Sequence, residues 1–291
     1  TLGFKITGDR VSSFFNDELI LGSFLVRFMP VILWFIFFLK IDLKKNIIPF
    51  ITFFSLYFIT IYLSGGRTSF FLSVVIILGL FIIIKDLRRI LSYSIIILIF
   101  FIFITSYFKI GNANTFNRIF VKTYNQISKT EININKSDTK IKKKLKKTNI
   151  YSKDHEGHIL LALYLFEKNK IFGIGPQGFK DYCRKVKYAP KIGICSTHPH
   201  NILIQIILEL GLIGLVFYIV AAVFVLFNFF KSIVRHKFNH DYLAFYSITL
   251  GLIINLFPFI PGGNFFNNWI SIILYYNIGL YLYSYKKCIL K

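Results

Sequence analysis

Two kinds of side chain in this sequence could act together on an anionic substrate. Arg27 lies inside one apolar stretch and Arg67 between two others, while His198 and His200 belong to the sequence THPHN, which directly precedes a long apolar run. A guanidinium group binds phosphate through two parallel hydrogen bonds, and a neutral imidazole accepts a proton near pH 7. We therefore predict a site in which the arginines stabilise a phosphate leaving group while His200, supported by His198, deprotonates an attacking hydroxyl.

Each of these residues also has a purely structural interpretation. Arg27 could extend its charge from a membrane span to the polar interface, and Arg67 could be an ordinary loop cation. His200, with a proline beside it, could be a helix-start residue that hydrogen-bonds the backbone. The functional interpretation is favoured because the topology derived below brings all of them to one face of a membrane.

The composition indicates an integral membrane protein. The 291 residues are 55% hydrophobic and 19% aromatic, with a mean hydropathy of +0.61, which is too apolar for a soluble domain. Runs of about 18 or more apolar residues are long enough to cross a bilayer as helices, and they do not alternate as β-barrel strands do. We expect an all-α polytopic protein with seven spans, at 22–39, 47–64, 69–84, 90–108, 201–230, 243–260 and 268–285.

Positive charge is distributed unequally between the loops. Nearly all of it lies in one alternating set, formed by 40–46, 85–89, 231–241 and the C-terminal tail. Short cytoplasmic loops retain lysine and arginine, so the other set, including 1–21, 64–69, 109–200 and 261–267, is expected to face outward. The net charge of +22 then reflects loops beside anionic lipid, and we predict no nucleic-acid partner.

The expected organisation has three parts. Residues 1–108 hold an outer segment and four spans, 109–200 form a large outer loop, and 201–291 hold three spans and a cytoplasmic tail. The lysine-rich part of the loop, 129–153, lacks apolar periodicity and is predicted to be a mobile insert. Residues 156–168 have helical periodicity. The apolar face of this predicted helix consists of Ile159, Ala162, Leu163 and Phe166.

Glycines mark two further features. The sequence FGIGPQGF at 172–179 predicts a backbone turn, because it lacks the strand and helix of a dinucleotide fingerprint. In the fifth span, a stripe of residues at helical spacing predicts close packing of two helices. The stripe consists of Gly211, Gly214, Tyr218 and Ala222. Glu209, nine positions after His200, is half a turn out of phase and is not expected to orient that ring.

The cysteines and histidines of the outer loop could form a disulfide or a zinc site. Cys183 and Cys195, twelve positions apart, are expected to form a disulfide in an oxidising compartment, although two free thiols remain the alternative. A zinc site would need several ligands from His155, His158, Cys195, His198 and His200. Only His155 and His158 have ligand-like spacing and no Cys-x-x-Cys pair accompanies them, so we predict no metal.

The motifs together resemble those of the O-antigen ligase and O-antigen polymerase superfamily. In that family a histidine and a small amide or hydroxyl residue precede nine residues and a Gly-x-x-Gly, which correspond here to His200, Asn201, Gly211 and Gly214. Further matches are SGGRTSF with Arg67, GDRVSSFFNDELILGSFLVRF with Arg10 and Arg27, GIGPQGFKDYC, and PGGNFFNNW. The resemblance covers most of the chain apart from the lysine-rich insert.

The resemblance implies a glycosyltransferase of the membrane C class in a bacterial inner membrane. Such an enzyme takes a glycan from a polyprenyl diphosphate at the periplasmic face and uses no metal or other cofactor. His200, Arg67 and Arg27 would be catalytic, and Arg10, His198, Asn201 and Arg184 would contact substrate, although Arg10 and Arg184 could merely solvate the surface. The acceptor would be the lipid A core for a ligase or a growing glycan for a polymerase.

The resemblance also bears on the start of the chain. Family members have about twelve helices, with the large loop between the ninth and tenth, whereas here it follows the fourth predicted span. Because Thr1 is not an initiator and the chain begins outside, we expect an odd number of upstream helices, five by this comparison. A polytopic transporter is the remaining alternative, but internal repeats and broken helices near mid-membrane, which transporters commonly show, are not evident.

Overall fold

The computed structural model describes residues 6–7, 10–15, 19–108, 114–128, 153–185, 195–234 and 239–290. Each predicted span coincides with a helix, although the bounds differ. These helices are α1 (Leu21–Phe38), α2 (Ile47–Leu63), α3 (Arg67–Ile83), α4 (Leu87–Tyr107), α11 (Ile202–Val234), α12 (His240–Asn255) and α13 (Asn268–Cys288). Within the described part, α1, α4 and α11 are long and apolar enough to cross a membrane, and α2 and α3 are shorter apolar helices. The chain is therefore an all-α membrane protein.

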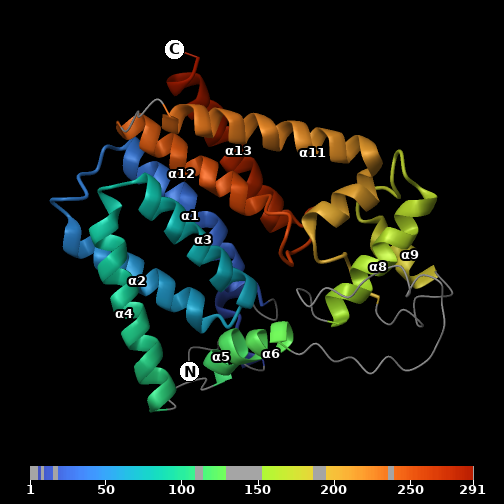
Figure 1. Cartoon of the computed structure of the whole chain (residues 1–291), viewed down its shortest axis with the longest axis horizontal. Coiled ribbons are helices and arrows are strands. Elements are labelled where there is room, and N and C mark those ends of the chain that lie inside the picture. The colour runs from blue at the N-terminus through green and yellow to red at the C-terminus, as the bar shows by residue number, and fades with distance from the viewer. Residues whose placement is uncertain are drawn as a thin grey trace.

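Helix α12 forms the centre of the bundle. It packs along α1 on one side and α13 on the other, while α2 and α4 pair with each other beside α3 (Figure 1). Because α12 is enclosed, even its hydroxyl groups are buried, and Ser247 and Thr249 donate to carbonyl groups one turn back in the helix. In contrast, α4 and most of α11 expose large apolar side chains, as expected of surfaces that contact lipid.

Two predicted spans differ from the observed helices. The span expected at 243–260 ends as a helix at Asn255, because Pro258 disfavours helical backbone in the residue before it. The span expected at 201–230 is broken, since Gly211 has φ 69° and ψ −162° inside α11. The predicted packing stripe through Gly211 is therefore wrong, because a stripe on one face requires an unbroken helix.

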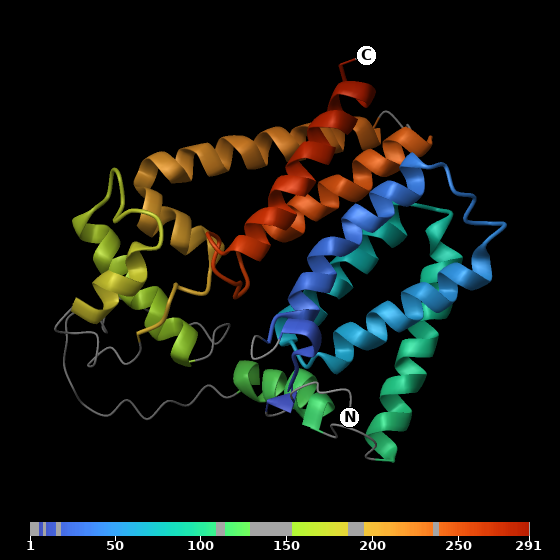
Figure 2. The ribbon, with the colours of Figure 1, turned by 180° about the vertical axis from the view of Figure 1, so that it is seen from behind.

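Shorter elements gather at one end of the bundle. They include a two-stranded antiparallel hairpin, β1 (Ile6–Thr7) and β2 (Arg10–Val11), and a 3-10 turn η1 (Ser13–Phe15). α5 (Asn114–Phe116), the π-helical η2 (Asn117–Val121) and α6 (Lys122–Ser128) follow α4. α8 (Lys153–Lys168) and α9 (Gly178–Lys185) precede α11. Seen from behind, α5 and α6 lie below the start of α1, and α8 and α9 lie to the left, beside the start of α11 (Figure 2).

Helix α8 extends over the predicted 156–168 but rotates its apolar face. The residues buried against α9 and α11 are Leu161, Ala162 and Leu165, with Phe166 packed against them, so Ala162 and Phe166 of the predicted face are confirmed. The predicted Ile159 and Leu163 are half-buried. Nearly every residue from 159 to 166 is apolar, so the sequence did not determine which face would pack. Of the predicted lysine-rich insert, residues 129–152 lie outside the described residues.

Candidate active site

Arg67 begins α3 at the end of the bundle described above, and two further arginines lie near it. Gly65 takes a left-handed conformation with φ 66°, and the turn it makes leads into Arg67. Arg67 Nη1 donates to Gln126 Oε1 of α6 at 2.9 Å. Arg118 Nε of η2 donates to the carbonyl oxygen of Gly65 at 3.0 Å. The loop before α3 and the segment after α4 are thus joined through two guanidinium groups.

Arg10 completes this arginine cluster, defined here as Arg10, Arg67 and Arg118. Its Nη2 donates to the carbonyl oxygen of Leu19. Burial, followed by the charges of Arg118 and Arg67, lowers the pKa of Arg10 to about 10. Within the described residues, no carboxylate pairs with any of the three arginines. Three neighbouring cations that lack an acidic partner in the described part of the chain form a site suited to an anion.

Arg27 lies one and a half turns into α1 and is 2% exposed. Its Nη1 donates to Ser23, through both the hydroxyl and the carbonyl oxygen, and its Nε is buried without a hydrogen-bond partner among the described residues. A side chain that only reached for the interface would expose its charged end. The snorkelling alternative is therefore not what the structure contains.

Four imidazole rings gather beside the start of α11, and we call His155, His158, His198 and His200 the histidine cluster. The ring centroid of His200 lies 4.0 Å from that of His198, 5.0 Å from that of His155 and 5.1 Å from that of His158. His200 itself has a left-handed backbone, with φ 58°. Such a conformation is unfavourable for a residue other than glycine, and neighbouring contacts must stabilise it.

Two rings of the histidine cluster, His198 and His200, are neutral at physiological pH. Burial, followed by the neighbouring His198, His155 and His158, lowers the pKa of His200 to about 3. Burial is also the main cause for His198, whose pKa is lowered to about 4. Although the rings are close together, no group of three or more histidine, cysteine or acidic residues within the described part is arranged to hold a metal ion.

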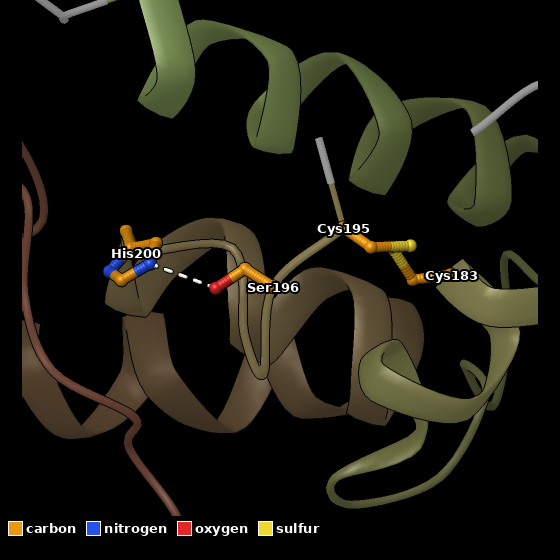
Figure 3. Close-up of a disulfide and its surroundings, with 4 residues drawn as sticks. All are labelled: Cys183, Cys195, Ser196 and His200. Carbon is orange, nitrogen blue, oxygen red and sulfur yellow. Dashed lines mark hydrogen bonds between the residues drawn. A yellow bond between two sulfur atoms is a disulfide. The ribbon is translucent and has the colours of Figure 1, made fainter. Parts of the chain in front are cut away.

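Short contacts orient the two rings of the THPHN sequence. Ser196 Oγ lies 3.0 Å from His200 Nε2 (Figure 3). Thr197 Oγ1 lies 2.9 Å from His198 Nδ1, and the carbonyl oxygen of Gly262 lies 3.3 Å from His198 Nε2. The Gly262 N–H donates to the His200 carbonyl oxygen at 2.8 Å. Sequence reasoning missed Ser196, which had only its proximity to the histidines as a signal.

A disulfide joins Cys183 of α9 to Cys195, with 5.6 Å between the Cα atoms (Figure 3). Cys195 comes five residues before His200, so the bond ties the histidine loop directly to α9. Cys183 is fully buried against Leu161 and Leu165 of α8 and Leu208 of α11. The disulfide therefore lies within a small apolar core that unites the three helices.

The glycine-rich turn before α9 inserts into the break in α11. The N–H groups of Ile174 and Gly175 donate to the carbonyl oxygens of Leu208 and Glu209 at 3.0 Å, which the break leaves without helical partners. In return, the N–H groups of residues 212 and 213 donate to the carbonyl oxygens of residues 170 and 171. A Cβ atom on Gly211 would lie 2.1 Å from one of those carbonyl oxygens. The predicted turn is thus a substitute for the hydrogen bonds of a broken helix.

Glu209 is the polar centre of this joint, and its side chain is fully buried. Its carboxylate accepts hydrogen bonds from the Gln177 N–H at 3.0 Å, the Phe179 N–H at 3.4 Å and Gln205 Nε2 at 3.1 Å. Gln205 also contacts the loop after α12, because its Nε2 donates to Asn264 Oδ1 and its Oε1 accepts from the Phe265 N–H. As expected, Glu209 does not orient His200 directly. Its hydrogen bonds connect the turn at Gln177 and Phe179 with Gln205 near the start of α11.

Two residues predicted to contact substrate are placed differently. The amide group of Asn201 is hydrogen-bonded within the protein, and Arg184 lies away from the clustered side chains. Asn201 is buried, with its Nδ2 donating to the Pro258 carbonyl oxygen at 2.8 Å and its Oδ1 accepting from the Ile204 N–H at 3.0 Å. It therefore caps the start of α11. Arg184 is exposed on α9 and has no hydrogen bond or ion pair with a described residue. Arg118 was not predicted, since a lone arginine after a span resembles a loop cation.

Comparison with known proteins bears on this arrangement. The O-antigen ligase family model matches residues 50–219, more than half of the chain, which confirms the family resemblance of the motifs. The matched region includes Arg67, Arg118, both disulfide cysteines and the whole histidine cluster. No curated protein and no solved structure matches the chain.

Proposed function

The chain belongs to the O-antigen ligase family, and from this membership we propose that it transfers a glycan from a polyprenyl diphosphate to a sugar hydroxyl of the lipid A core. The observation that carries the proposal is the arginine cluster, which has no acidic partner among the described residues. A diphosphate leaving group gains negative charge as its bond to the sugar breaks. Guanidinium groups held in place beforehand stabilise that charge without reorganisation.

His200 is the proposed general base. Its neutral ring takes the proton of the acceptor hydroxyl while the acceptor oxygen bonds to the anomeric carbon and the bond from that carbon to the diphosphate oxygen breaks. Polyprenyl diphosphate leaves with the bonding electrons. Because a nearby anion favours the charged form of imidazole, a bound diphosphate close to His200 would raise its pKa above the value of about 3 in the empty site.

We assign supporting roles to the other predicted residues. Arg27 and Arg67 contact the diphosphate with Arg10 and Arg118, and His198 supports His200. Asn201 acts by capping α11 rather than by touching substrate, because its amide groups have partners inside the protein. Arg184, which is exposed on α9, would contact only the distal glycan.

The same proposal fixes an orientation. All seven helices of the predicted spans cross a bacterial inner membrane, and the arginine and histidine clusters face the periplasm. The distribution of charge supports this arrangement, since the opposite end of the bundle has the cationic loops and the ion pairs Lys44–Asp86 and Lys287–Asp241. The three-part division at residues 108 and 200 follows from it.

The test measures donor binding and glycan transfer separately, in membranes of the producing strain with chromosomal substitutions. His200→Ala should abolish transfer and leave donor binding intact, because a proton leaves the acceptor only during its attack. Arg67→Lys should weaken donor binding, because lysine keeps the charge and loses the two-pronged hydrogen bonding.

The outcomes are separable. Turnover close to wild type in His200→Ala would remove the catalytic assignment, and unchanged donor binding in Arg67→Lys would remove the diphosphate site. Offering both lipid A core and a second lipid-linked glycan as acceptors decides the class of transferase. Product only on the lipid-linked glycan would replace the ligase proposal with a polymerase.

A further inference from the structure

We propose that His155 of α8 is a second proton acceptor, which takes from His200 the proton that the acceptor hydroxyl releases. This inference rests on the proposed function and adds to it a residue from outside the histidine motif. His155 and His200 have ring centroids 5.0 Å apart at an interplanar angle of 63°, so an edge of one ring faces the other. At that separation a ring rotation or one water molecule completes a hydrogen bond between the rings.

The position of His155 is determined by well-packed elements. His155 and His158 are three residues apart in α8 and therefore lie on the same side of the helix. The helix is held by Leu161, Ala162 and Leu165 in the apolar core that it shares with α9 and α11. His158, which is 4% exposed, continues that packed face, and its ring centroid lies 5.1 Å from that of His200.

The surroundings of His200 explain why it needs such a partner. A catalytic histidine commonly has a carboxylate that stabilises the imidazolium formed during reaction. Among the described residues, the titratable groups facing His200 are His155 and His158 from α8 and His198 from its own loop. The loop after α12 contributes the backbone of Gly262 and contains no charged side chain between residues 256 and 267.

Glu209 and Glu156 are acidic residues of the helices that contact the histidine loop. Glu209 of α11 accepts hydrogen bonds from Gln177, Phe179 and Gln205. Glu156 lies beside His155 in the sequence of α8. Because burial makes the charged form of His200 unfavourable, an adjacent imidazole that accepts its proton returns His200 to the favoured neutral form.

The step is balanced as a proton transfer. The acceptor hydroxyl loses its proton to one ring nitrogen of His200, and the other proton-bearing nitrogen of the resulting imidazolium donates to His155. His200 returns to the neutral form, and His155 releases the proton to water. No electron transfer or further reactant is involved.

His155→Ala tests the relay in membrane vesicles with the polyprenyl-diphosphate-linked donor. We expect transfer to fall by about tenfold, a part of the 10²–10⁴ that general base catalysis typically contributes. Added imidazole at millimolar concentration should restore most of the loss, because it can occupy the vacated space and accept the proton. Glu156→Gln is the matched control on the same turn of α8. It should transfer glycan at the wild-type rate, and added imidazole should not change that rate.

The outcomes separate this inference from the proposed function. Transfer in His155→Ala equal to wild type, or a loss that imidazole does not restore, would overturn the relay, and the second result would assign a structural role to His155. His200→Ala should remain inactive with and without imidazole at wild-type donor binding. If His200→Ala is active, the proposed function fails as well, whereas inactivity of His200→Ala with a normal His155→Ala contradicts the relay alone.

Discussion

The arginine cluster and the histidine cluster lie at the same end of the bundle but are held in different ways. Arg67 and Arg118 connect short segments through single hydrogen bonds to Gln126 and the Gly65 carbonyl oxygen. The histidine cluster is enclosed by a disulfide, a small apolar core and the joint at Gly211. Under the proposed function, the general base therefore has the more extensive support, whereas each guanidinium of the proposed phosphate site is held by fewer contacts.

The electrostatics of the two clusters follow the same division. The arginines keep their charges and repel one another, so a bound anion stabilises them. The imidazoles avoid charge, since burial lowers the pKa values of His198 and His200 to about 4 and about 3. One cluster thus supplies fixed charge and the other supplies neutral bases.

Gly211→Ala should disrupt the histidine side most strongly. The added Cβ atom would lie 2.1 Å from a backbone oxygen, and the backbone at φ 69° and ψ −162° is accessible almost only to glycine. We expect a loss of about 4 kcal/mol in the free energy of unfolding and no transfer, measured by thermal unfolding in detergent and by assay. Gly279→Ala, where a Cβ atom meets nothing within 4 Å, is the control. Equal stability of the two variants would show that the close contact between Gly211 and the glycine-rich turn does not stabilise the fold.

Cys183→Ser should have the next largest effect. A bridge that closes a loop of this length stabilises a fold by about 2–3 kcal/mol, and Cys195 lies five residues before His200. We expect that loss in unfolding experiments and a lower transfer rate at unchanged donor affinity. The double variant Cys183→Ser, Cys195→Ser should be no worse than either single variant. Additive losses would show that the cysteines act separately.

Arg118→Met tests the arginine side. Removal of a charged hydrogen-bond donor from the proposed anion site should weaken donor binding by about 1.5–3 kcal/mol. Thermal stability should change little, because among the described residues Arg118 makes one hydrogen bond, to the Gly65 carbonyl oxygen at 3.0 Å. Binding isotherms with the lipid-linked donor measure this. Arg89→Met, at an exposed position near the start of α4 and at the opposite end of the bundle, is the control and should bind normally. Normal donor affinity in Arg118→Met would exclude this residue from the phosphate site.

The pH dependence of stability should be the smallest effect. The pKa values of about 4 for His198 and about 3 for His200 lie below the unfolded value of about 6.5, so the unfolded chain binds protons first as the pH falls. The stabilisation is complete above pH 6.5 and decreases toward pH 4, by at most about 1.4 kcal/mol per pH unit for each ring.

His198→Gln should flatten this pH dependence, because one of the two depressed imidazoles is removed. Unfolding midpoints measured at pH 7, 6 and 5 provide the comparison, with His240→Gln at the exposed start of α12 as the control. If His198→Gln and wild type lose stability in parallel, the ring of His198 is not held neutral by the fold.

The sequence by itself determined the helical class, the approximate bounds of the membrane helices and the motif around His200. These features depend on the length of apolar runs and on local spacing, which are readable along the chain. It also suggested the pairing of Cys183 with Cys195, because two cysteines in an oxidising loop have few alternatives. Arg67, Arg27 and His200 stood out since charged or basic groups beside apolar runs are rare.

Only the tertiary structure decided which residues meet. The rotation of α8, which brings His155 and His158 onto His200, depends on packing against α9 and α11, because an almost continuous apolar run has no preferred face. The break at Gly211 depends on a turn about 40 residues earlier in the chain supplying the missing hydrogen bonds, a pairing that no local pattern encodes. Arg118 joins Arg67 for the same reason: its partner, the Gly65 carbonyl oxygen, is brought near by the folding of distant segments.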